Sequence, residues 1–395
     1  MRILFHHRIA SRDGQAVHME ELIGALQRAG HETILVGPAS FTETHFGNSN
    51  RTIDTIKRML PGAAWELAEL GYNLPAWWRL RRAVRQHKPD VIYERFSLFL
   101  LAGLWVRRSS GLPLLMEVNS PLFEERAKND GLRLHALGRK AQAWLWRGAD
   151  AVLPVTQVLA DTIRNYGVAA DRIAVIPNGI DPRRFAAAPQ SEAAKAALGL
   201  SGRLVLGFTG FVRGWNAVHR LLDFAAARRG QDVHVLLVGD GPARESLLAH
   251  AAKLGIADRL TITGVVGRDA VAAHVAAFDI AVIPGVTPYA SPLKLFEYLQ
   301  LGRAVVAPDE ANIREILTDG RDALLFDPGA ADGLERALDR LCGDADLRCR
   351  LGSAGPGVIA ARGLTWDRNA ARVVALAESF LQERGAGAVA PALSS

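Results

Sequence analysis

The feature that most constrains this chain is an alternation, repeated twice, between short apolar runs and segments with helical periodicity. Runs rich in Val, Ile and Leu that alternate with amphipathic segments are typical of consecutive β-α-β units, in which helices join parallel strands. Because these runs contain few polar residues, they predict strands that are buried on both faces. The sequence therefore predicts an α/β chain with two doubly wound, Rossmann-like sheets.

The predicted elements follow from this alternation. In the first half, strands are expected at residues 2–5, 33–36, 91–94, 114–117, 151–155 and 173–176, with a helix at 17–29. In the second half, strands are expected at residues 204–208, 233–238, 260–263, 280–284, 304–306 and 323–326, and helices at 218–229, 243–254, 270–278 and 293–301. A length of 395 residues is sufficient for two such domains.

The join between the domains is expected in an alanine-rich stretch that contains Pro and Ser, at residues 186–191. This predicts an N-terminal domain at residues 1–190 and a second domain at 191–366. Residues 367–395 are predicted to form a helix that returns to the first domain, followed by a tail rich in Ala, Gly and Pro. Asp367 is expected to cap the amino end of this helix.

Composition limits the class of protein. The two cysteines, Cys342 and Cys349, are expected about two turns apart on one helix, so we expect neither a local disulfide nor a Cys-x-x-Cys zinc site. The longest strongly apolar run, residues 98–106, is far shorter than the roughly 20 residues that cross a bilayer. The first residues resemble a core strand and not a signal peptide, so a cytoplasmic location is expected. A formal net charge of +6 does not choose among anionic partners.

A glycine-containing turn follows the predicted strand at 233–238. Gly239 and Gly241 lie in a Gly-Asp-Gly-Pro sequence that opens a helix, which is typical of either a tight turn or a nucleotide-binding turn. A dinucleotide fingerprint would need a third glycine where this chain has Arg244, so a nicotinamide site is not favoured. The chain also lacks a Gly-x-x-x-x-Gly-Lys-Ser/Thr loop, which argues against the common class of ATPase.

The most informative segment is residues 291–302, where a strand leads through a loop into a helix. The free N–H groups at the start of such a helix can hold a diphosphate. Lys294 lies in the first turn, where the helix dipole disfavours a cation unless an anion is bound nearby. Glu297 follows one turn later, a position that by itself is typical of an exposed glutamate.

Four motifs, in this order, resemble those of the retaining GT-B glycosyltransferases of glycosyltransferase family 4. They are residues 13–18 after the first strand, the segment at 175–181, the turn at 237–242 and the loop and helix that end in Glu297. The resemblance covers nearly the whole chain. It implies two facing Rossmann-like domains and the transfer of a sugar from a nucleotide-sugar to an acceptor hydroxyl, in cell-surface polysaccharide or glycolipid assembly.

The resemblance also implies site residues. Glu297 aligns with the glutamate that binds the donor ribose, whereas the earlier glutamate of the family motif is replaced by Tyr289. Phe211 and Asn216 occupy the positions at which many relatives carry an Arg and a Lys that clamp the diphosphate.

We therefore predict that Arg213 and Lys294 replace that pair and form, with Glu297, the catalytic set. The other donor-binding residues are predicted to be Gly14, Gly239, Gly241, Tyr289, Ser291 and Leu293.

Acceptor-side residues are expected in the first half of the chain. The candidates are Glu94 with Arg95, and Glu117 to Ser120 including Asn119, which lie at the carboxyl ends of predicted strands, where open α/β sheets bind ligands. His18 lies in the first turn of a predicted helix and is either a ligand contact or a packed histidine. We expect neither a metal nor another cofactor besides the nucleotide-sugar co-substrate. The Asp-x-Asp sequence that begins at Asp344 is expected to be a helix cap.

Tryptophan and arginine cluster at residues 77–82, 105–108 and 144–147. Interfacial helices use this combination, which predicts an anionic membrane surface and a lipid-linked acceptor, unless the tryptophans pack in the core with arginine at the rim. Because basic residues are otherwise scattered, no nucleic-acid partner is expected.

Two alternative functions remain open on the sequence alone. One is a hydrolysing nucleotide-sugar epimerase of the same fold, which needs no acceptor. The other is a catalytically silent nucleotide-sugar-binding protein, with Tyr289 in place of the usual glutamate.

Overall fold

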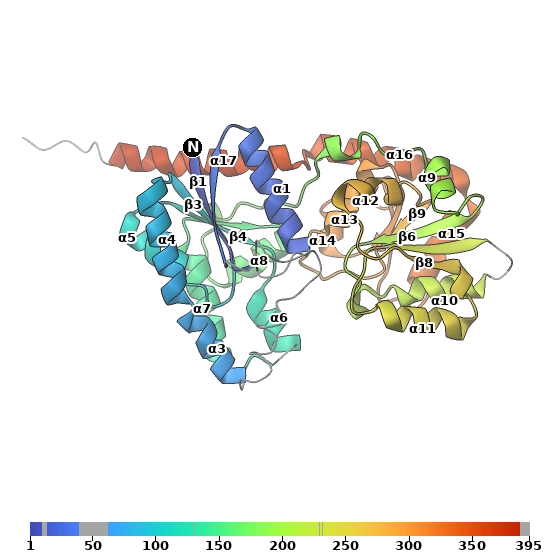
Figure 1. Ribbon diagram of the computed structural model, residues 1–395, viewed down its shortest axis with the longest axis horizontal. Coiled ribbons are helices and arrows are strands. Elements are labelled where there is room, and N and C mark those ends of the chain that lie inside the picture. Colours follow the sequence, from blue (N-terminus) through green and yellow to red (C-terminus); the bar gives the residue numbers. More distant parts are fainter. Residues whose placement is uncertain (10–13, 39–61, 130, 229, 231, 388–395) are drawn as a thin grey trace, which may run out of the picture. The chain divides into compact units, whose positions relative to one another are not determined.

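The computed structural model describes residues 1–9, 14–38, 62–129, 131–228, 230 and 232–387 (Figure 1). The chain divides into two compact units: Met1–Pro177 with Trp366–Ser395 form unit 1, and Asn178–Thr365 form unit 2. The predicted boundary at residue 190 therefore lies too far along the chain. The reason is that residues 178–190 already make their contacts within unit 2, where Ile180 pairs with Thr365 and Phe185 packs on the core.

Unit 1 contains a parallel sheet with the strand order β2-β1-β3-β4-β5. Its strands are β1 (Arg2–His6), β2 (Glu32–Val36), β3 (Val91–Arg95), β4 (Leu114–Val118) and β5 (Ala151–Pro154). Its helices are α1 (Gly14–Arg28), α3 (Gly62–Gly71), α4 (Asn73–His87), α5 (Ala102–Ser110), α6 (Leu122–Asn129), α7 (His135–Gly148), α8 (Gln157–Asn165) and α17 (Trp366–Gly387). Every residue of β3, β4 and β5 is buried, as expected for strands covered on both faces.

Unit 2 contains a second parallel sheet, with the order β11-β10-β9-β6-β7-β8. Its strands are β6 (Leu204–Thr209), β7 (Val233–Val238), β8 (Leu260–Ile262), β9 (Ile280–Val282), β10 (Ala304–Pro308) and β11 (Leu324–Phe326). Its helices are α9 (Ser191–Ala197), α10 (His219–Ala227), α11 (Arg244–Leu254), α12 (Arg268–Val275), α13 (Leu293–Gln300), α14 (Ala311–Arg314), α15 (Gly333–Gly343) and α16 (Ala345–Arg362). Two apolar clusters form its core. The prediction of two doubly wound sheets is confirmed.

One predicted strand, at residues 173–176, is wrong. This segment runs along β5, and the N–H groups of Ala174 and Ile176 donate to Val152 and Pro154 at 3.0 and 2.9 Å. Pro154 has no N–H to return to the segment, so the ladder stops at a single bridge between Val152 and Ile173.

The final helix belongs to unit 1, as predicted. α17 packs on α1, and Asp367 pairs with Arg28 at 2.6 Å. Because α17 begins at Trp366, Asp367 lies inside the first turn and is not the N-cap, so that detail of the prediction is wrong. Residues 388–395 of the predicted tail lie outside the described residues.

The two cysteines lie on different helices. Cys342 is on α15 and Cys349 on α16, and both are free thiols. The expected single helix is interrupted because Asp344 ends one helix and caps the next, where its side chain accepts the N–H of Leu347 at 2.8 Å. The predicted capping role of Asp344 is thereby confirmed.

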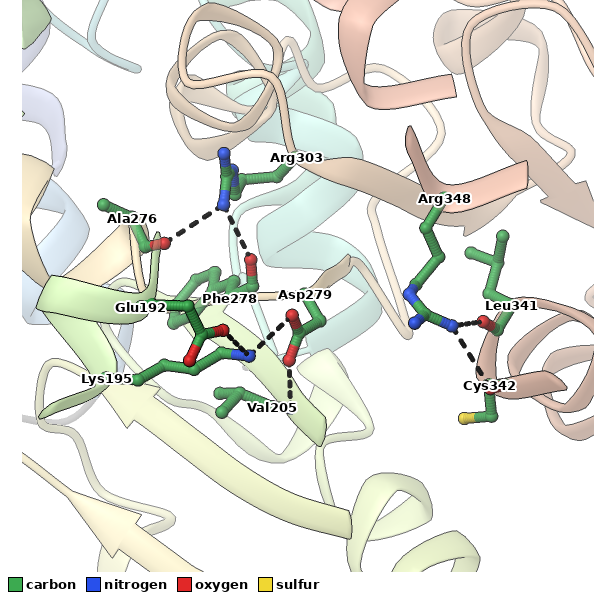
Figure 2. Close-up of polar contacts among 10 residues, drawn as sticks. All are labelled: Glu192, Lys195, Val205, Ala276, Phe278, Asp279, Arg303, Leu341, Cys342 and Arg348. Carbon is green, nitrogen blue, oxygen red and sulfur yellow. Dashed lines mark hydrogen bonds and ion pairs between the residues drawn. The ribbon is translucent and has the colours of Figure 1, made fainter. Parts of the chain in front are cut away.

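An ion pair between the buried Lys195 and the half-buried Asp279 ties α9 to the sheet of unit 2 (Figure 2). Lys195 donates to Asp279 at 2.8 Å, and the other oxygen of Asp279 accepts the N–H of Val205 at 2.7 Å. Figure 2 also shows Arg303 donating to the carbonyl oxygens of Ala276 and Phe278. These contacts satisfy polar groups at the amino ends of β6 and β9, on the edge of the sheet opposite the one considered next.

Candidate functional site

The carboxyl edge of the unit 2 sheet has the topology of a ligand site. The chain starts at β6, adds β7 and β8 on one side and then β9, β10 and β11 on the other, so the winding reverses between β6 and β9. Open α/β sheets bind ligands at the carboxyl ends of the strands at such a reversal. The loop after β6 carries Arg213, and the loop after β9 leads into α13.

Lys294 projects from the first turn of α13 toward the end of β6. Its ammonium lies 4.5 Å from the centre of the Phe208 ring. It also lies 3.5 Å from the position that a Cβ atom would occupy on residue 210, where the backbone φ of +123° favours the glycine found there. Burial lowers the pKa of Lys294 to about 8, although Glu297 opposes this shift. Within the described residues, no carboxylate forms an ion pair with this ammonium.

Arg213 lies on the same loop as Gly210 but is exposed. Its guanidinium stands over the ring of Phe211, 5.1 Å from the ring centre. The Arg213 N–H donates to Asn216 Oδ1 at 2.8 Å, which fixes the short turn Gly214–Asn216. The structure thus brings Lys294 and the Arg213 loop to the end of one strand, while no contact joins these two side chains in the described part of the chain.

The predicted donor-binding glycines have a packing role. A Cβ on Gly239 would lie 2.3 Å from the carbonyl oxygen of Gly210, and one on Gly241 would lie 2.3 Å from that of Val212. Hydrogen bonds join the same loops, since Gly210 N–H donates to Val238 and Val212 N–H to Asp240, both at 2.9 Å. Close backbone packing therefore accounts for both glycines, and their contact with a donor stays a prediction.

Two buried asparagines, which the prediction did not include, hold the loop that enters α13. Asn178 Nδ2 donates to the carbonyl oxygen of Ser291 at 2.5 Å, and the Asn178 N–H donates to Ser291 Oγ at 3.1 Å. Asn312 Nδ2 donates to the carbonyl oxygens of Thr287 and Ala290 at 3.1 and 2.6 Å. The hydroxyl of Ser291 thus has a structural role beside its predicted contact with the donor. The Pro-Asn-Gly motif was the only sequence signal for Asn178.

The other predicted residues of this loop and helix lie beside these anchors. Tyr289 and Leu293 are half-buried, and Glu297 is half-buried one turn after Lys294. Tyr298 fixes the position of the helix, because its hydroxyl accepts the Thr209 N–H at 2.8 Å at the end of β6. Burial raises the pKa of Tyr298, so this hydroxyl stays neutral.

The carboxyl edge of the unit 1 sheet carries a buried polar network around Glu117 at the end of β4. Its carboxylate accepts hydrogen bonds from Tyr93 at 2.8 Å and Arg95 at 2.6 Å, and it lies 3.0 Å from His18 Nε2. The side-chain amide of Asn119 also donates to Glu117. Burial alone would raise the pKa of Glu117, but the charges of His18 and Arg95 together with hydrogen bonds hold it well below its usual range.

A second buried pair lies on the neighbouring strands. Glu94 Oε2 is 2.5 Å from His6 Nδ1, and both side chains are buried. A Cβ on Gly103 would come within 2.1 Å of the same carboxylate oxygen, so glycine leaves room for this pair. Beside it, burial and the charges of His6 and Arg95 lower the pKa of His7 to about 3. His7 Nδ1 accepts the N–H of Ile9 at 3.1 Å, consistent with a neutral ring.

The predicted acceptor-side residues thus converge only in part. His18 and Asn119 both contact Glu117, whereas Glu94 pairs with His6. α1 begins at Gly14, so Gly14 is the first helical residue and not a loop residue, and His18 lies in the second turn. His18 is a buried histidine whose ring stands edge-on to Trp366 at 4.9 Å.

Sequence reasoning missed Tyr93 in the Glu117 network and His6 in the neighbouring pair with Glu94. The available signal was the presence of polar residues at the ends of otherwise apolar strands, which open α/β sheets bring to one edge. A small cavity beside the network is lined by Tyr93, Glu117, His18 and Trp366.

No group of three or more His, Cys, Asp and Glu side chains in the described ranges is arranged to hold a metal ion. Across these same ranges, no helix combines the length and apolar character needed to cross a membrane.

Family models match the two halves of the chain in turn. Glycosyltransferase Family 4 matches residues 12–184, and Glycosyl transferases group 1 matches residues 203–344. Among named relatives, the 2-deoxystreptamine glucosyltransferase of Streptomyces kanamyceticus is 30% identical over 62% of this chain and 65% of its own length. The GDP-mannose-dependent alpha-mannosyltransferase of Mycobacterium tuberculosis is 26% identical over 80% of this chain and 81% of its own. For the first of these relatives, about a third of the length lies outside the match.

Solved structures share the fold at low sequence identity. Sucrose-phosphate synthase from Thermosynechococcus elongatus superposes with a TM-score of 0.79 and 16% identity, covering 97% of this chain and 100% of that one. HepE from Anabaena, solved in complex with UDP, superposes with a TM-score of 0.75 and 19% identity, covering 96% and 100%. The chain thus carries a Glycosyltransferase Family 4 domain followed by a Glycosyl transferases group 1 domain, on the two-sheet fold that its solved structural neighbours share.

Proposed function

We propose that the protein is a retaining glycosyltransferase that moves a sugar from a nucleoside diphosphate sugar to an acceptor hydroxyl. The observation that carries this proposal is Lys294, a half-buried ammonium over Gly210 that feels the charge of Glu297 but forms no ion pair among the described residues. Desolvating a cation without pairing it is costly unless a bound anion compensates. The diphosphate of a donor supplies that anion.

The surroundings of Lys294 suit a diphosphate in three further ways. The first N–H groups of α13 have no partner within the helix, and the helix dipole favours negative charge there. The Arg213 loop adds a guanidinium at the end of the same strand, β6. Asn178 and Asn312 hold the loop before α13 in place, so the N–H groups at the start of α13 are already positioned before a diphosphate binds.

In the proposed reaction, the bond between the anomeric carbon and the diphosphate oxygen breaks, and the electron pair leaves with the nucleoside diphosphate. The acceptor oxygen forms its bond to the same face of the sugar, and its proton passes to the departing phosphate oxygen. Lys294, Arg213 and the α13 amides stabilise the charge that develops on the leaving group. Glu297 is assigned to the donor ribose, and no metal or protein nucleophile takes part.

The acceptor is assigned to the polar edge of unit 1. The Glu117 network is internally neutralised and offers hydroxyl, amide and imidazole groups, which suits an uncharged, hydroxyl-rich acceptor more than a strongly charged one. We place the reaction in cell-surface polysaccharide or glycolipid assembly. The acceptors named for relatives, 2-deoxystreptamine and D-inositol 3-phosphate, belong in the same test.

The decisive experiment incubates the protein with UDP- and GDP-sugars, with chelator present, and with or without lipid extract, inositol phosphate or 2-deoxystreptamine. Acceptor-dependent release of nucleoside diphosphate and a product with the donor's anomeric configuration would support the proposal. Acceptor-free formation of an epimerised sugar would show a hydrolysing epimerase instead. Donor binding without turnover on any acceptor would leave a binding protein.

The variant Glu297→Gln tests whether Glu297 binds the donor ribose or only supports the local structure. We expect a loss of donor affinity that is smaller for a donor analogue lacking the ribose hydroxyls, because the missing carboxylate no longer accepts from them. Gln300→Glu, on the same helix, is the matched control and should leave donor affinity near wild type. Equal affinity of Glu297→Gln and wild type for intact UDP or GDP would remove the ribose assignment.

A further inference from the structure

Three helices of unit 1 cover the same face of its sheet. α4, α5 and α7 precede β3, β4 and β5, which join the sheet one after another in the same direction. Right-handed crossovers therefore place all three helices on one face. α4 packs against α5, and Leu104 of α5 lies against Gly148 of α7. Figure 1 shows the three helices gathered in one part of unit 1.

This face is basic and free of carboxylates on its helices. No Asp or Glu occurs in α4, α5 or α7, which carry four, two and three Arg or Lys residues respectively. One of these, Arg107, is used internally in an ion pair with Asp150 at 2.5 Å. The exposed cations of this face are Arg81, Arg82, Arg85, Arg108, Arg139, Lys140 and Arg147.

Large apolar side chains are exposed on the same helices. Trp78 on α4 is 58% exposed and Trp144 on α7 is 67% exposed, accompanied by Leu74 and Leu137. By contrast, Trp146 is fully buried against Phe96 and Tyr166, so the membrane interpretation is wrong for that residue. Within α7, Trp146 packs in the core and Trp144 is exposed to solvent. A large apolar side chain on the solvent face of an amphipathic helix indicates that this face binds a partner.

We propose that this face, defined by α4, α5 and α7, docks on an anionic lipid bilayer. The cations attract anionic headgroups, and Trp78 and Trp144 insert at headgroup depth. Exposed leucines beside the tryptophans favour a bilayer over a nucleic acid, because leucine offers no stacking surface to a base. This inference goes beyond the proposed function, because docking does not depend on catalysis.

The test measures binding of the full chain to vesicles of phosphatidylcholine alone and of phosphatidylcholine mixed with phosphatidylglycerol. Each neutralised arginine should weaken binding to the anionic vesicles about fivefold, so the triple variant R81Q/R82Q/R85Q should bind about a hundredfold more weakly. The matched control, R336Q/R340Q/R350Q, removes the same charge from exposed positions of unit 2 and should bind within about twofold of wild type.

Quenching by brominated lipid tests the tryptophans. Wild-type emission should be quenched, and the double variant W78F/W144F should lose most of that quenching, whereas W215F, exposed on unit 2, should keep it. Thermal unfolding of each variant reports that the chain is folded. Failure of wild type to bind anionic vesicles, equal weakening by the control triple, or binding to RNA in place of vesicles would each overturn the proposal. An absence of sugar transfer from the UDP- and GDP-sugars would not affect the proposal that this face docks on a membrane.

Discussion

The carboxyl edges of the two sheets differ in how their charges are balanced. In unit 1, Glu117 is surrounded by Tyr93, Arg95 and His18, so the buried charges compensate one another within the fold. In unit 2, Lys294 lies over Gly210 with no ion pair to another described residue. Two doubly wound parallel sheets, with different strand orders, thus present a neutralised edge and an edge with a cation outside any ion pair.

This difference indicates which edge needs a charged ligand. The Glu117 network, whose charges balance one another, contributes to stability. It can bind a neutral, hydroxyl-rich molecule with little change in that charge balance. A half-buried cation outside any ion pair lowers the stability of the empty protein, and the protein regains that free energy when an anion binds. The comparison therefore predicts opposite responses of the two edges to substitution and to pH.

The largest effect is expected for Lys294→Met. Affinity for UDP or GDP should fall at least a hundredfold, about 3 kcal/mol, because the charged partner of the diphosphate is lost. The empty variant should be more stable than wild type at neutral pH by roughly 1 kcal/mol, since no ammonium has to be desolvated. Calorimetric titration and thermal unfolding measure the two quantities.

Lys253→Met, on the exposed surface of α11, is the control and should change neither quantity appreciably. A Lys294→Met variant that binds nucleoside diphosphate as tightly as wild type would remove the anion site from this edge.

Glu117→Gln should have the reverse profile. Removing the carboxylate leaves Arg95 and His18 without their shared partner, so the free energy of unfolding should fall by about 3 kcal/mol in urea titrations. Nucleoside diphosphate affinity of the folded protein should not change. The exposed Glu245→Gln is the matched control, and a Glu117→Gln protein as stable as this control would show that the network is not a source of stability.

Acid should destabilise unit 1 through His7. Its pKa is lowered to about 3 from 6.5, so the unfolded chain binds a proton that the folded chain excludes, and stability falls as the pH drops below about 6.5. Between about pH 6.5 and pH 5 the expected loss is about 2 kcal/mol. His7→Gln should flatten this part of the profile, measured as the urea midpoint against pH. An unchanged slope in the variant would assign the titration to another group.

Alkali should weaken the anion site of unit 2. The pKa of Lys294 is about 8 in the empty protein, so above that pH a growing fraction of the protein carries a neutral amine. Affinity for UDP or GDP should fall about tenfold between about pH 7 and pH 9, and Lys294→Met should show no such fall. The same slope in wild type and variant would contradict a role for this ammonium.

The smallest effect is expected for Arg213→Ala. The side chain is exposed and stacked on Phe211, so solvent screens its charge, and nucleoside diphosphate affinity should fall only about threefold to fivefold. Arg340→Ala, exposed on α15, is the control. A loss as large as that of Lys294→Met would show that the two cations act as an equal clamp.

The fold was largely predictable because it depends on patterns that are local in sequence. The apolar runs of β7 and β10 identify buried strands directly, and Asp344 followed by an amphipathic segment identifies a helix start. The strand expected at 173–176 failed because pairing also depends on the partner, and Pro154 cannot donate.

The sites were less predictable, because they depend on contacts between distant segments. Glu117 and His18 are far apart in sequence, and nothing in either neighbourhood shows that one neutralises the other. The glycines at 239 and 241 looked like ligand contacts, yet the backbone of a neighbouring loop already requires them. Trp144 and Trp146 stand two residues apart, and only the orientation of α7 separates the exposed ring from the buried one.

The membership of α17 in unit 1 has a consequence for biosynthesis. The segment that packs on α1 leaves the ribosome only after all of unit 2 has been made. During synthesis, unit 2 can complete its core first, while the face of α1 that packs on α17 remains exposed. Premature termination shortly before Trp366 would therefore release a chain whose later half is folded and whose earlier half is the target for chaperones and proteases.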